Sequence, residues 1–74
     1  MYCITVPAYI SANTFNPVRI AQDLRLVGAE RVLLAIDFLS NDKKIMEGYY
    51  RTLADAIPYF QKEGFEVKYY KRGE

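Results

Sequence analysis

The sequence predicts an α/β fold in which three parallel strands of one sheet alternate with two helices, in the order β-α-β-α-β. Three segments rich in β-branched and aromatic residues alternate with two segments whose apolar residues recur at helical spacing. The middle strand segment, residues 32–38, begins with an unbroken apolar run, which is typical of a parallel strand buried on both faces. With 74 residues, the chain is expected to form one small domain spanning residues 1–74.

The first strand and the loop after it are predicted from side-chain type. Residues 2–6 are β-branched or aromatic, and Pro7 is expected to end the strand. Residues 8–15 are expected to form a loop that carries Tyr9, Ser11, Asn13 and Thr14. The first strand therefore covers Tyr2–Val6.

A first helix is predicted from about Pro17 to Val27. Asn16 is a favoured N-cap residue, and Pro17 suits the first helical position because its missing N–H costs nothing there. Apolar residues at helical spacing follow, at Ile20, Leu24 and Val27. Gly28 is placed to end the helix in a left-handed conformation.

A second helix is predicted after the middle strand. The polar run 40–42 supplies N-cap residues, and a helical apolar pattern continues for four turns at Met46, Tyr49, Tyr50, Leu53, Ile57 and Phe60. Pro58 removes the hydrogen bond to the Ala54 carbonyl and is expected to kink or interrupt the last turn. Gly64 is expected to end this second helix, as Gly28 ends the first.

The last strand is predicted at Phe65–Tyr70. Its side chains alternate, with apolar residues at 65, 67 and 69 and charged residues at 66 and 68. This alternation is typical of an edge strand with one face in water. Residues 71–74 form a polar tail.

Two strand orders fit these elements. The order 1-2-3 is favoured because it puts the most apolar strand in the middle, and right-handed crossovers then place both helices on one face of the sheet. The alternative order 2-1-3 would put the helices on opposite faces. In the favoured order the other face has no helix, and either Leu33 and Ala35 or Leu34 and Ile36 would meet water. We therefore expect a homo-oligomer that covers this apolar sheet face.

Two stretches of the sequence resemble the beginning of glycoside-hydrolase-like (β/α)₈ TIM barrels. They are Gly28-Ala-Glu-Arg-Val-Leu-Leu-Ala-Ile-Asp37 and Ala56-Ile-Pro-Tyr-Phe-Gln-Lys-Glu-Gly-Phe-Glu-Val67. The resemblance implies a partial barrel, and glycoside hydrolase activity if the segment belongs to a longer protein. In many such hydrolases the catalytic carboxylates lie on later strands, so the resemblance assigns no catalytic residue to this chain.

In a barrel, ligands bind at the carboxyl ends of the strands. We expect carbohydrate contacts from Tyr9, Asn13, Asp37 and Tyr70, because rings stack on the apolar faces of sugars and polar groups bond their hydroxyls. Three further polar residues follow the strands, namely Ser11, Ser40 and Arg72. For Asp37 the competing interpretation is a cap of the following loop or helix, and for the loop after the first strand it is an ordinary turn.

Several function classes are excluded by composition. The chain has no histidine, one cysteine and a net charge of +1. We therefore expect no metal site, no cofactor and no cysteine-based catalysis. No glycine-rich phosphate loop occurs, and no apolar run is long enough for a membrane span. The absence of a basic, apolar leader indicates a cytoplasmic protein with no membrane partner.

These observations predict a non-catalytic, self-associating unit with weak carbohydrate binding. The first alternative is a small protein-interaction module that is complete in itself. The second, a binder of single-stranded nucleic acid, depends on the mixture of rings and positive charges in residues 68–72. We expect a solvated edge strand there instead, so nucleic acid is not an expected partner.

Overall fold

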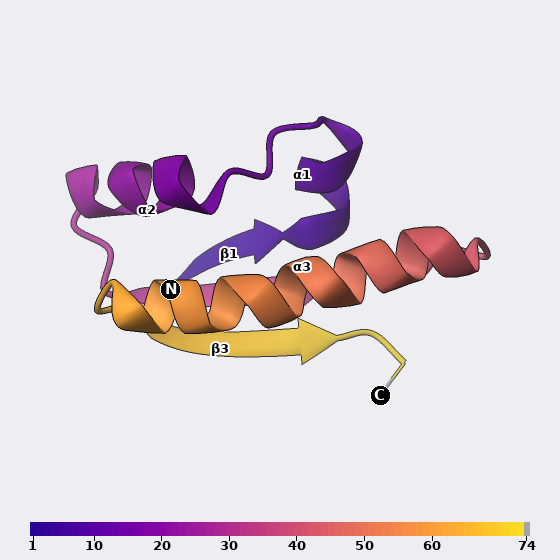
Figure 1. The fold of residues 1–74 in the computed structure, drawn as a ribbon. Coiled ribbons are helices and arrows are strands. Elements are labelled where there is room, and N and C mark those ends of the chain that lie inside the picture. The colour runs from indigo at the N-terminus through magenta and orange to yellow at the C-terminus, as the bar shows by residue number, and fades with distance from the viewer. Residues whose placement is uncertain (74) are drawn as a thin grey trace.

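The computed structural model describes residues 1–73 and shows an α/β fold (Figure 1). Its elements in chain order are β1 (Tyr2–Thr5), α1 (Val6–Ser11), α2 (Pro17–Leu26), β2 (Arg31–Ile36), α3 (Lys43–Lys62) and β3 (Glu66–Lys71). The three strands form one parallel sheet in the order β1-β2-β3. The predicted fold class and the favoured strand order are therefore confirmed.

The described helices lie together on one side of the sheet. Both α1 and α2 contact α3, while α3 lies along β2 and β3. Figure 1 shows α3 across the sheet and α2 on the side of β1, away from β3. The core fills the space between these layers and contains Ile4, Leu34, Leu53 and Phe60, each at most 5% exposed.

The predicted starts of the two long helices are confirmed in atomic detail. The Asn16 side chain accepts hydrogen bonds from the backbone N–H groups of Val18 and Arg19 at the start of α2. The Asp42 side chain does the same for Lys44 and Ile45 at the start of α3. Each cap satisfies N–H groups that have no acceptor within their own helix.

The predicted helix ends are also confirmed. Gly28 and Gly64 have φ angles of +75° and +96°, a conformation that side chains with a Cβ rarely adopt. Each glycine turns the chain back toward the next strand, β2 or β3. The two glycines therefore set the lengths of α2 and α3.

The structure corrects the prediction for residues 6–15. Val6 was expected in the strand and residues 8–15 in a loop, but Val6–Ser11 forms α1. Pro7 lies in the first turn of this helix, where a backbone N–H would have no helical acceptor, so the missing N–H of proline costs nothing there. Proline therefore ends β1, as expected, and also begins a helix.

Pro58 was expected to kink or interrupt the last turn of α3, and the interruption is wrong. The helix continues without a break to Lys62. Pro58 and Ala54 are both exposed, so the Ala54 carbonyl that loses its helical partner can meet water. Smaller differences affect the strands: β2 ends at Ile36, before Asp37 and Phe38, and β3 is shifted by one residue to Glu66–Lys71.

The sheet face without helices has a smaller apolar area than predicted. The register aligns Cys3, Leu33 and Lys68 in one row, and Thr5, Ala35 and Tyr70 in the next. These rows alternate with core positions such as Ile4 and Leu34, so they face away from the described helices. Leu33 and Ala35 lie at the centre, with Cys3 and Thr5 on one flank and Lys68 and Tyr70 on the other. Leu33 is half-buried and Ala35 is only 4% exposed, so the expectation that both would meet water is wrong for Ala35.

Candidate functional site

An open groove with a volume of about 1030 Å³ lies between α2 and β1. We call it the α2–β1 groove. Three consecutive β1 residues line it, together with Tyr9, residues 13–17 and α2. The α2 wall and its end supply Arg19, Ile20, Asp23, Leu24 and Val27.

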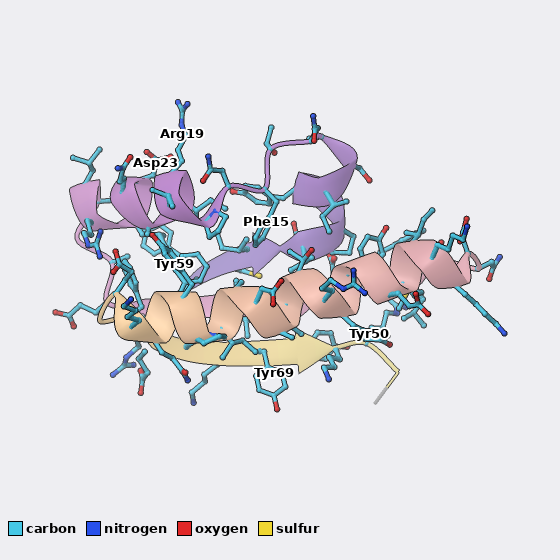
Figure 2. All side chains as sticks on the ribbon, in the orientation of Figure 1. Phe15, Arg19, Asp23, Tyr50, Tyr59 and Tyr69 are labelled. Carbon is cyan, nitrogen blue, oxygen red and sulfur yellow. The ribbon has the colours of Figure 1, made fainter. Side chains whose placement is uncertain are left out.

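Aromatic rings form one end of the α2–β1 groove. The rings of Tyr9 and Phe15 meet edge to face, with their centroids 6.2 Å apart. Figure 2 shows Phe15 between α2 and β1, and Arg19 extending from α2 away from the sheet. Asn13 also lines the groove and holds a φ angle of +55°. The groove therefore combines an apolar floor with polar groups at its rim.

Two of the predicted site residues, Tyr9 and Asn13, share this groove. Phe15, Arg19 and Asp23 also line it, although the sequence did not single them out. Arg19 and Asp23 are four residues apart on α2, which looks like an ordinary solvated helix face. Their place beside β1 depends on where α2 lies over the sheet, which helical periodicity does not specify.

Asp37 lies in a second, smaller hollow at the carboxyl ends of the strands. This hollow has a volume of about 260 Å³ and is also lined by Ser11 and Tyr49. The Arg72 guanidinium donates a hydrogen bond of 3.2 Å to the Asp37 carbonyl oxygen. The polar residues that follow the three strands thus come close together here, as parallel topology predicts.

Ser40 acts at the start of α3. Its hydroxyl oxygen accepts a hydrogen bond of 3.1 Å from the Asp42 backbone N–H, and its own backbone N–H points at the Met46 sulfur, 3.2 Å away. These contacts shape the loop before the helix cap.

Tyr70 lies apart from both hollows. It is in β3, aligned with Ala35, on the sheet face that the described helices leave open. The four predicted carbohydrate residues are therefore distributed over three places: the α2–β1 groove, the Asp37 hollow and the sheet face. They do not line one common cavity.

The basic and aromatic residues of the last strand are divided between the two sheet faces. Lys68 and Tyr70 lie on the open face, while Tyr69 and Lys71 are in register with core positions on the helix side. The Lys71 ammonium lies 5.5 Å from the Tyr50 ring centre and 5.8 Å from that of Tyr69. The rings and charges that looked continuous in the sequence therefore form two separate surfaces.

Two negative findings apply to residues 1–73. No three His, Cys, Asp or Glu side chains gather there in a way that could hold a metal ion. Neither the long α3 nor any other helix of this part combines the length and apolar character that a membrane crossing needs.

Comparison of the chain with protein-family models, curated proteins and solved structures finds no match. The resemblance to glycoside-hydrolase-like barrels therefore stays a prediction that depends on the two sequence stretches alone.

Proposed function

We propose that this chain is a non-catalytic β/α binding unit that associates with a second copy of itself through its open sheet face. One observation carries the proposal: every described helix lies on one side of a parallel sheet, and the centre of the other side has the half-buried Leu33 beside Ala35, which is 4% exposed. Parallel sheets in soluble proteins are almost always covered on both faces.

The charges on the open face allow it to pack against the same face of a second copy. Its amino end carries an ion pair between Arg31 and Glu66, with 2.8 Å between the guanidinium and carboxylate atoms. Lys68 adds one more positive charge in the next row. Because both signs are present, two such faces can meet in a two-fold arrangement without strong repulsion. The polar flanks indicate an interface of modest affinity.

A partial barrel remains compatible with this proposal. In a (β/α)₈ barrel, strands follow in sequence order, helices lie outside, and the inner sheet face packs against the other strands. The order β1-β2-β3 and the one-sided helices support this interpretation. In that setting, Leu33, Ala35 and Tyr70 would face the barrel interior, and the face would be covered by further strands.

The test is the molar mass in solution, measured by light scattering or sedimentation equilibrium over a range of micromolar concentrations. We expect a mass that rises from the 8.6 kDa of one chain toward twice that value. Leu33→Lys places a charge at the centre of the open face and should give a monomer. Leu26→Lys is the matched control, because Leu26 is 84% exposed on α2, and it should leave association unchanged.

Circular dichroism shows whether Leu33→Lys still folds. Thr5→Lys is a second variant. It places the new charge on the same sheet face, in the edge strand β1. A wild-type protein that stays monomeric at the highest concentration would contradict the proposal. Equal masses for the wild type and both open-face variants would contradict it as well.

A further inference from the structure

We infer that the Asp37 hollow binds a small primary amine in its ammonium form, with an aromatic ring attached. Three parts of the chain line this hollow: α1 with Ser11, the loop after β2 with Asp37 and Phe38, and α3 with Tyr49. Because α1 and α3 form its walls, the hollow lies on the helix side of the sheet. Binding there is separate from self-association through the open face.

The Tyr49 side chain is buried, yet its hydroxyl has no partner among residues 1–73. The residue belongs to the core and is 5% exposed, and no hydrogen bond to its hydroxyl occurs in this part of the chain. Every fully buried side-chain nitrogen or oxygen of these residues has a partner, so the Tyr49 hydroxyl must touch solvent. Because Tyr49 lines the Asp37 hollow, that contact is made in the hollow. Polar atoms of buried side chains are usually partnered, and a ligand in the hollow can supply the partner.

The Asp37 carboxylate in the same hollow is also without a protein partner. The hydrogen bond from Arg72 goes to the Asp37 backbone carbonyl and not to its carboxylate. Within residues 1–73 no ion pair includes Asp37. The side chain does not cap the next helix either, because Asp42 caps α3. The carboxylate is therefore available to a cation in the hollow.

The polar groups of the hollow match a primary ammonium ion. The Asp37 carboxylate and the hydroxyls of Ser11 and Tyr49 can each accept a hydrogen bond, and a primary ammonium ion has three N–H donors and no acceptor. A neutral hydroxyl ligand could bond to the same oxygens, but it would leave the carboxylate charge uncompensated. Charge complementarity therefore favours a cation over a sugar.

The apolar residues of the hollow indicate the rest of the ligand. Phe38 is 61% exposed although its side chain is large and apolar, and Pro7 and Ala8 line the hollow from α1. An aromatic ring attached to the ammonium group can pack against the Phe38 ring and cover it. The volume of about 260 Å³ is below the range of about 300–1,000 Å³ typical of drug-sized ligands, so the ligand is limited to a single ring.

The probe is phenethylamine, which carries a positive charge at neutral pH as a lysine side chain does. Titration of the isotope-labelled full chain, followed by NMR, should give saturable shifts of the backbone amide signals of the residues that line the hollow. The Kd should be on the order of 1 mM, because the nearby Arg72 guanidinium weakens the attraction of a cation. 2-Phenylethanol has the same ring and chain length but no charge, and it should bind about fivefold more weakly.

Two conservative variants test the residues that carry the inference. Asp37→Asn keeps the shape of the side chain and removes its charge, so phenethylamine should bind about fivefold more weakly while 2-phenylethanol is unaffected. Tyr49→Phe keeps the ring in the core and removes the unpartnered hydroxyl, so binding should weaken about threefold. Asp55→Asn and Tyr59→Phe are the matched controls: both residues are on α3 and outside the hollow, so binding should stay unchanged.

The inference is overturned by an absence of saturable binding, by equal binding of phenethylamine and 2-phenylethanol, or by an unchanged affinity of a folded Asp37→Asn variant. Glucose that binds at the same signals more tightly than phenethylamine would assign the hollow to sugars. Nα-acetyl-lysine amide presents its ammonium group as a protein would, and it should bind more weakly because it has no ring to pack on Phe38. Tighter binding of this compound would assign the hollow to a lysine of another protein. Each titration can be repeated on Leu33→Lys, so a failure of self-association does not affect the result.

Discussion

At the scale of single residues, the caps show how local chemistry fixes the boundaries of the elements. Asp42 accepts hydrogen bonds of 2.9 Å and 3.4 Å from two backbone N–H groups in the first turn of α3. Its carboxylate also lies at the positive end of the helix dipole. We expect Asp42→Ala to lower the free energy of unfolding by about 1 kcal/mol, measured by urea denaturation. Asn41→Ala changes the exposed neighbouring residue and is the control; equal losses for both variants would contradict a capping role for Asp42.

Residue chemistry also decides which parts of the candidate site the sequence could predict. Asp37 and Ser11 were expected near each other because both follow strands, and they line one hollow. Tyr70 was expected with them, but it lies inside β3 and its side chain follows the alternation of that strand. The predicted end of β3 was correct to one residue, yet such an error decides whether a side chain belongs to the sheet face or to the loop above it.

At the scale of elements, the apolar patterns predicted the long helices and the strands, while short-range packing decided the rest. In α1, Val6 and Pro7 are buried, and so short a helix depends on these contacts rather than on its own propensity. A six-residue segment shows too little periodicity to be told from a loop. The placement of α2 over the β1 side, which forms the α2–β1 groove, likewise depends on packing against α3 and leaves no trace in helical spacing.

Proline in α3 gives a prediction at this scale. Pro58 is exposed and lies inside the helix, where it removes one backbone hydrogen bond without adding buried surface. Pro58→Ala restores the N–H donor to the Ala54 carbonyl and is expected to stabilise the protein by about 1–3 kcal/mol in thermal or urea unfolding. Asp55→Ala, at another exposed position of α3, should change stability by less than about 0.7 kcal/mol. A Pro58→Ala variant that is no more stable than the wild type would show that the turn is adapted to proline.

At the scale of the whole molecule, the strand order decides what the protein needs from its surroundings. The most apolar strand is central, as predicted, and right-handed crossovers then place the helices on one side. The amount of apolar surface on the open face was harder to predict. It depends on which alternate set of β2 residues turns outward, and the outward set has Leu33 and Ala35 rather than Leu34 and Ile36. The outward set buries less apolar surface in an interface than Leu34 and Ile36 would.

Association through this face should appear in the stability of the fold as well as in its mass. A domain of this size buries only roughly 60% of the surface that its unfolded chain exposes, so a second copy bound to the open face would add to a small total stability. If the dimer unfolds to separate chains, each tenfold rise in protein concentration adds about 1.4 kcal/mol to the apparent stability. The wild-type Tm should therefore rise with concentration, and the Tm of Leu33→Lys should be lower and constant. Leu26→Lys should follow the wild type. A wild-type Tm that is independent of concentration, with a monomer mass throughout, would mean that the sheet tolerates water on its open face through the polar flanks of Thr5, Lys68 and Tyr70.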